Sequence, residues 1–293
     1  MKGSRRASLA ALLALFAAAA ALLPAGAAAF AGPWTDGQGD KAPVSHRYIA
    51  RLQKDEALIL AAKAEADMLM AQKLSPENAV GLAVLKIEQS NAAFRYREAI
   101  RQEQVDLLAV AAQVDITDAV VRDAPAELAV TLSDTIGAWR SIWALAGIDE
   151  FNLVRIHPRP LGQAEPSSAL AGYYKASANH YQLDWTFLAS INFIESDFGR
   201  VNGPSSAGAL GPMQFMPATW DAYGSGGDVN NPKDAIDAAA RYLFLSGGRQ
   251  HMDTALFAYN HDNDYVAAVN YYADLIRHDS AWLDRLYYWN TLG

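Results

Sequence analysis

The chain has 293 residues, of which 52% are hydrophobic, and its 32 acidic against 24 basic residues give a net charge of −8. This excess of acidic residues argues against nucleic acid or an anionic membrane as the main partner. The chain has no cysteine, so core packing rather than disulfide bonds must hold its fold.

The first 31 residues are predicted to be a secretory signal peptide. Lys2, Arg5 and Arg6 form a basic start, and a continuous apolar run from Leu9 to Leu23 follows. That run is short for a membrane span, and small residues suited to cleavage follow it. We therefore expect an exported protein of the periplasm, the cell envelope or the extracellular space, with no membrane span after cleavage.

Residues 32–44 are polar and rich in glycine and proline, which predicts a flexible leader. A helical region is expected over 45–156. It starts with two long helices, Ser45–Lys73 and Pro76–Val114, whose short connection makes an antiparallel hairpin. Ser75 is expected to cap the second helix. Apolar residues recur at helical spacing: Tyr48, Leu52 and Ile59 in the first helix, and Val80, Val84, Ile87 and Phe94 in the second.

The remainder of this region is predicted to be a junction, Asp115 to Ala124, followed by a helix over Ala126–Ala146 that Gly147 ends. Core packing is expected for the two tryptophans of that helix. Its apolar stripe consists of Leu132, Ile136, Trp139 and Trp143. The size of the region leaves two roles open for the hairpin, which are binding a protein partner and supporting a second domain.

Three prolines and two glycines mark residues 157–172 as a linker, and residues 173–293 as a second domain. No segment alternates long enough to predict a strand, so the chain is expected to be all-α. The helices expected in the second domain are Tyr173–Tyr181, Asp184–Glu195, Asp234–Ser246, Asp253–Tyr259 and Asp264–Arg277.

Glu195 stands out because it ends a helix that is apolar on nearly every face. Such a helix is expected to be buried, with Asp184 as its N-cap. Burial and the negative end of the helix dipole both disfavour the charged form of Glu195. Its pKa is therefore expected to rise into the range where a carboxylic acid can donate and recover a proton near neutral pH.

Three motifs follow in order: Glu195-Ser196, the run SAGALGPMQFMP from Ser206 to Pro217, and Ala258-Tyr259-Asn260. In this order and spacing they resemble the lysozyme-like domain of lytic murein transglycosylases, and the resemblance covers about residues 168–277. It implies a goose-lysozyme-like transglycosylase domain that acts on peptidoglycan glycan strands. The bond cleaved would be the β-1,4 bond between N-acetylmuramic acid and N-acetylglucosamine.

By this resemblance Glu195 is the sole acid/base, and the C6 hydroxyl of the sugar closes a 1,6-anhydro ring, so that no partner carboxylate is required. Trp220 and Tyr223 are equally compatible with sugar platforms and with core packing. The residues expected to bind substrate are Ser196, Met213, Gln214, Phe215, Tyr259 and Asn260, with Trp220 and Tyr223 as further candidates.

No metal or other cofactor is expected. The loop 224–230 has Asp228 as its only charged residue, and hard cations need several oxygen ligands. Two alternatives remain open. A lysozyme-type hydrolase would need a second acid or a held water, for which Asp197 and Asp264 are candidates. A non-catalytic wall-binding or scaffold protein would use the helical hairpin as its working surface.

Overall fold

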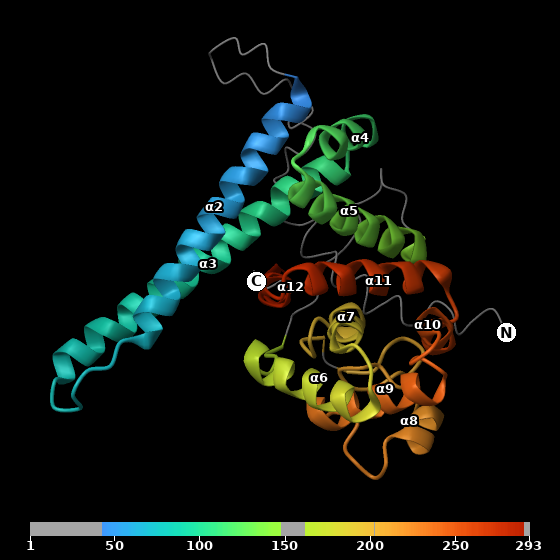
Figure 1. The fold of residues 1–293 in the computed structure, drawn as a ribbon. Helices are drawn as coiled ribbons and strands as arrows, with labels where there is room; N and C mark the ends of the chain where they lie inside the picture. Colours follow the sequence, from blue (N-terminus) through green and yellow to red (C-terminus); the bar gives the residue numbers. More distant parts are fainter. Residues whose placement is uncertain (1–42, 148–161, 202, 290–293) are drawn as a thin grey trace. The chain divides into compact units, whose positions relative to one another are not determined.

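In this computed structural model, residues 43–147, 162–201 and 203–289 are described. They form eleven helices (Figure 1), and these three stretches contain no strand, only an isolated bridge between Leu210 and Phe215. The predicted all-α class is thus confirmed. Two compact units are present, one within Ala28–Ala129 and one within Val130–Gly293. The predicted signal peptide lies outside the described residues.

The first unit consists of helices α2 (Val44–Ala71), α3 (Ala79–Ala111) and α4 (Val114–Asp123). Helices α2 and α3 run side by side as an antiparallel hairpin (Figure 1). The predicted start of the second helix is wrong, because Asn78 rather than Ser75 is the N-cap and accepts a hydrogen bond from Gly81 N. Ser75 Oγ donates instead to the Glu77 carboxylate over 2.8 Å.

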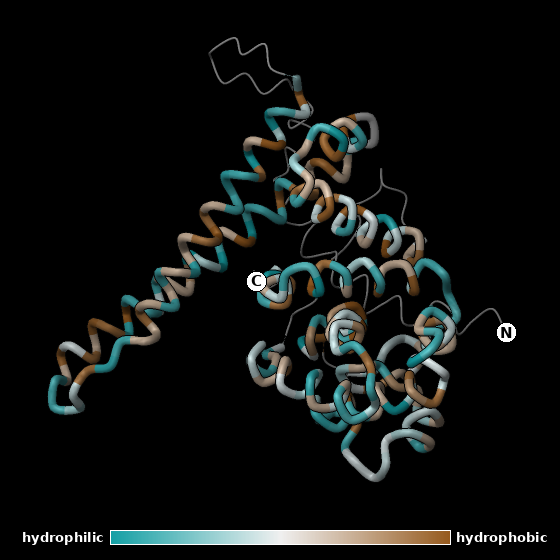
Figure 2. Tube along the Cα trace, viewed as in Figure 1, coloured by the Kyte–Doolittle hydropathy of each residue, from teal (hydrophilic) through white to brown (hydrophobic). Residues whose placement is uncertain are grey.

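Helix α3 carries two apolar stripes on opposite sides, and only one of them is covered. Leu85 and Ala92 form a core cluster with Leu69 of α2. The stripe noted in the sequence is exposed instead, and Figure 2 shows hydrophobic stretches along the hairpin up to its turn. Its exposed fractions are 77% for Val80, 50% for Val84, 61% for Ile87 and 56% for Phe94. Helical spacing alone could not tell the two stripes apart.

The predicted junction Asp115–Ala124 is in fact helix α4. Thr117 is buried and its hydroxyl donates to the main-chain oxygen of Val110, while Val120 is fully buried. Ionisable groups are also buried in this unit. Arg51 Nε lies 2.5 Å from Asp106 Oδ2. Burial and the neighbouring Asp106 carboxyl raise the pKa of Asp55 to about 7.

The second unit has α7 at its centre, between α6 and α11 (Figure 1). Two short helices were missed in the sequence. Helix α8 begins with Pro217 at its first turn, and α12 follows the last helix expected from the sequence. The elements are α5 (Ala126–Ala146), α6 (Ser167–Tyr181), α7 (Trp185–Ser196), α8 (Pro217–Tyr223), α9 (Pro232–Leu245), α10 (Met252–Asn260), α11 (Asn263–His278) and α12 (Ala281–Trp289).

Helix α5 packs against α11 and α12 within this second unit. The rings of Trp139 and Trp289 are 5.5 Å apart, and Gly137 leaves space for the Tyr271 ring, which a Cβ would meet at 2.6 Å. Trp139 and Trp143 are buried, as predicted. Helix α6 begins at Ser167, inside the predicted linker 157–172, of which residues 157–161 are not described. The predicted limits between domains stay a prediction.

Candidate active site

The candidate site is built at the C-terminal end of α7. Asp184 caps this helix as predicted, because its Oδ1 accepts a hydrogen bond from Thr186 N over 3.0 Å. Glu195 lies in the last turn and only 2% of its surface is exposed. Asp197 then ends the helix in the left-handed conformation, with φ 50°. A carboxyl group is thus carried into the core on a buried helix.

Burial raises the pKa of Glu195 to about 8, and an interaction with the Tyr265 hydroxyl opposes this rise. Tyr265 is fully buried in the first turns of α11. Glu195 Oε2 and the Tyr265 hydroxyl are both buried and, within the described residues, neither has a hydrogen-bond partner of standard geometry. The two groups therefore interact without a fully formed hydrogen bond. At neutral pH the acid is mostly protonated, which is the form that can donate a proton.

Tyr259 connects the second and third motifs. Its hydroxyl donates a 2.7 Å hydrogen bond to the main-chain oxygen of Met213. Its ring lies parallel to the Tyr265 ring, with 4° between the planes and 6.3 Å between the centroids. Phe215 packs against the same ring at 6.0 Å. The predicted residues Met213, Phe215 and Tyr259 are thus brought together, and Tyr259 and Tyr265 both interact with Glu195.

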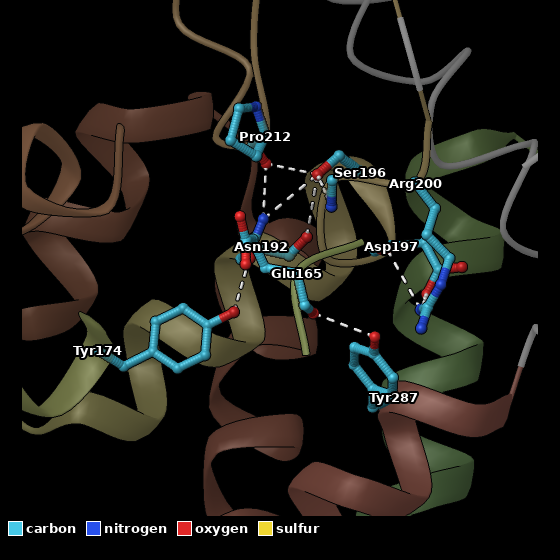
Figure 3. A network of polar contacts seen from close by, with 9 residues as sticks. Glu165, Tyr174, Asn192, Ser196, Asp197, Arg200, Pro212 and Tyr287 are labelled. Carbon is cyan, nitrogen blue, oxygen red and sulfur yellow. Dashed lines mark hydrogen bonds and ion pairs between the residues drawn. The ribbon is translucent and has the colours of Figure 1, made fainter. Parts of the chain in front are cut away.

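The main-chain oxygen of Pro212 anchors the second motif to α7 (Figure 3). It accepts hydrogen bonds from Ser196 Oγ over 2.5 Å and from Asn192 Nδ2 over 2.8 Å. Tyr174 of α6 orients Asn192 by donating to its Oδ1 over 2.6 Å. Ser196 is fully buried and also accepts from Gly199 N. This arrangement favours a role for Ser196 in holding the loop, where the sequence predicted contact with substrate.

Gln214 lies in a tight turn of the loop. Its φ of 50° is left-handed, and its Nε2 donates to the main-chain oxygen of Gly211 over 2.8 Å. Gly211 has a φ of 72°, and a Cβ there would lie 1.9 Å from the main-chain oxygen of Val229, so only glycine fits. Gln214 Oε1 is buried, and no donor in the described part of the chain reaches it.

The remaining predicted residues lie further out. Trp220 and Tyr223 of α8 are partly exposed. The Trp220 ring packs 5.5 Å from that of Phe215, and the Tyr223 ring packs 4.7 Å from that of Tyr242. Asn260 is the partly exposed last residue of α10. The structure therefore leaves part of each of these three side chains available to a ligand.

The other acidic residues considered in the sequence analysis, Asp197, Asp228 and Asp264, lie in three different environments. Asp197 is buried, and its Oδ1 lies 3.3 Å from Arg200 Nη1, with which it forms an ion pair. Asp228 forms a turn with Asn230, and Asp264 lies in the first turn of α11. Among the described residues, no group of three or more His, Cys, Asp or Glu side chains is placed to hold a metal ion.

Sequence reasoning missed Tyr265. It follows the third motif by a few residues, but its position in α11 looks like an ordinary core position, and only the packing of α11 on α7 brings it to Glu195. The one available signal was the tyrosine and phenylalanine content of this region. Tyr242, Tyr259 and Phe215 lie in one aromatic cluster with it.

The second unit is all-α and places the buried Glu195 carboxyl at the end of its central helix. Residues 172–272 match the family model described as Transglycosylase SLT domain. Searches among curated proteins and among solved structures found no match. The matched segment contains all three motifs, which confirms the resemblance seen in the sequence, and the hairpin lies outside it. Residues 172–272 of the second unit are therefore similar to a transglycosylase domain of lysozyme-like all-α fold, a family that acts on peptidoglycan.

Proposed function

We propose that this chain is an exported peptidoglycan lytic transglycosylase that cleaves the bond between N-acetylmuramic acid and N-acetylglucosamine and forms a 1,6-anhydro sugar. The observation that carries the proposal is the buried Glu195 carboxyl, whose pKa is raised to about 8 by burial. The predicted signal peptide over residues 1–31 supports export. None of the described helices is both long enough and apolar enough to span a membrane.

In the first step the protonated Glu195 donates its proton to the glycosidic oxygen, and the bond from that oxygen to the anomeric carbon breaks. The resulting carboxylate then accepts the proton of the C6 hydroxyl of the same sugar. The C6 oxygen bonds to the anomeric carbon, which closes the ring and restores the protonated acid. The reaction consumes no water, so a single acid/base is sufficient.

The surroundings of Glu195 support this plan over a two-carboxylate one. In the part of the chain that the structure describes, the groups that perturb its pKa are apolar surroundings and Tyr265, with no second carboxylate. Asp197, the nearest acid in sequence, is held by Arg200. A glycosidase that activates water needs a second carboxylate opposite the first.

Other residues around the site have roles that follow from their contacts. Gln214 Oε1 is a buried acceptor that a sugar hydroxyl or an N-acetyl N–H can satisfy, and leaving such an atom unpaired costs about 1–3 kcal/mol. Trp220 and Tyr223 offer partly exposed rings for stacking on sugars. Because only 2% of Glu195 is exposed, a glycan can reach the carboxyl only after neighbouring side chains shift.

A protein partner for the first unit belongs to the same proposal. The exposed stripe of α3, formed by Val80, Val84, Ile87 and Phe94, supports the prediction of a partner on the hairpin. Large apolar side chains exposed in a row are typical of contact surfaces.

Digestion of purified peptidoglycan followed by mass spectrometry of the products tests the enzymatic proposal. We expect anhydro-muropeptides from the wild type, one water lighter than the products of a hydrolase. Glu195→Gln should abolish their formation and keep the fold, whereas Asp264→Asn should leave product formation unchanged. Reducing ends in place of anhydro ends would favour a lysozyme-type hydrolase. No product from a folded wild type would favour a scaffold.

A further inference from the structure

A pocket of about 460 Å³ opens on the second unit beside the loops that hold the candidate site. Its wall comes from four segments: residues 163–166 before α6, the loop after α7, the turn at Gly211 and Pro212, and the residues before α9. Glu195 does not form part of this wall. The pocket is therefore separate from the acid but shares the Pro212 turn with it.

The segment before α6 is fixed to the end of the catalytic helix by main-chain and aromatic contacts (Figure 3). Tyr287 Oη donates to the main-chain oxygen of Glu165 over 3.0 Å, and Gly162 N donates to the main-chain oxygen of Arg200 over 2.7 Å. The Arg200 guanidinium lies 4.0 Å from the centre of the Tyr287 ring and pairs with Asp197. These contacts preform the pocket and hold it at a fixed place relative to α7.

The wall has the chemistry of a site for a neutral or cationic ligand. Among the described residues that form it, Glu165 is the single ionisable one, and this residue is exposed. Gln163 and Asn230 add side-chain amides, and Phe198 adds an apolar surface. The helix N-terminus beside the wall does not offer free N–H groups to an anion, because Asn231 caps it.

We propose that this pocket binds a short peptide with a free primary amine, whose ammonium group pairs with the Glu165 carboxylate. Amide groups at Gln163 and Asn230 suit a peptide main chain, and the glycine-lined wall allows close approach of the ligand. In peptidoglycan such peptides hang from the muramic acid next to the bond that is cleaved. The assignment of this peptide as the stem peptide rests on the proposed function.

The test is titration calorimetry of the full wild-type chain with two synthetic peptides. One is a stem peptide that ends in a diamino acid with a free side-chain amine, and the other is the same peptide with that amine acetylated. We expect the free amine to bind at least fivefold more tightly. Glu165→Gln should remove this preference, and the control Asp221→Asn, which deletes an equivalent exposed charge on α8, should keep it.

Glu165→Gln is expected to fold normally, because the contact from Tyr287 goes to the main-chain oxygen of this residue; a melting curve checks this. Equal affinity for the two peptides, absence of binding up to millimolar peptide, or a preference that survives in Glu165→Gln would overturn the inference. Because the peptides contain no glycan, their binding is measured independently of bond cleavage. If the wild type cleaves peptidoglycan but binds neither peptide, only the assignment of the pocket is refuted, and the proposed function stands.

Discussion

The hydroxyl of Tyr259 donates a 2.7 Å hydrogen bond to the main-chain oxygen of Met213, and so joins the third motif to the second across 46 residues of sequence. This bond holds the turn that carries Gln214 against α10. Tyr259→Phe removes the donor, leaves the Met213 oxygen without it and preserves the ring packing. A net hydrogen bond of this kind is worth about 0.5–1.5 kcal/mol.

For Tyr259→Phe we expect a drop in the rate of anhydro-product formation of up to about tenfold, since 1.4 kcal/mol corresponds to that factor. Melting temperature should fall only slightly. The measurement is product formation at saturating and at limiting substrate, alongside a thermal melt. A rate equal to that of the wild type would show that the bond does not position the loop.

The second prediction concerns the pH dependence of the rate and the Tyr265 hydroxyl. The proposed first step uses the protonated Glu195 carboxyl, so activity should fall as pH rises through about 8, the pKa of Glu195. Tyr265→Phe removes the group that lowers this pKa, so the alkaline limb of the profile should move to higher pH. A pH–rate profile of both proteins tests this, with Tyr271→Phe as a control in the same helix. An unmoved alkaline limb in Tyr265→Phe would exclude the assigned interaction.

The third prediction is that the buried Glu195 carboxyl makes the folded state less stable as pH rises. In the unfolded chain Glu195 ionises near 4.5, but in the folded chain it ionises near 8. Between these two pH values only the unfolded chain releases the Glu195 proton. The free energy of unfolding therefore falls by about 1.4 kcal/mol for each pH unit. Stability should therefore decrease as pH rises from about 4.5 to about 8, and level off above.

Glu195→Gln cannot ionise, so it should melt at a higher temperature than the wild type, by a margin that grows over this pH interval and is small near pH 4. Thermal melts at several pH values give the comparison, and the exposed Asp221→Asn is the control. A constant margin at every pH would mean that the carboxyl is not buried.

The fourth prediction uses the buried acids of the hairpin. Burial and the Asp106 carboxyl raise the pKa of Asp55 to about 7. The stability that the protonated Asp55 side chain contributes is therefore complete at acidic pH and is lost as pH rises through about 7. Asp55→Asn should raise the unfolding temperature of the first unit at pH 8 more than at pH 5. Circular dichroism melts can follow this, with the exposed Asp67→Asn as a control; an equal effect at both pH values contradicts the assignment.

Helix α7 was predictable from sequence because the signals that define it are local. Apolar residues on every face of 185–194 predict burial, Asp184 predicts the cap, and both features are present. The contact between Glu195 and Tyr265 was not predictable, because it depends on how α11 packs on α7. The two stripes of α3 illustrate the same limit. Each has helical spacing, and only the position of α2 decides that Leu85 is covered and Ile87 is not.

Helix α12 ties two separate stretches of the second unit together. Its residue Tyr287 contacts both Glu165, in the segment before α6, and Arg200, in the loop after α7. A change that unfolds α12 alone would therefore release both of these stretches, although neither is close to α12 in sequence.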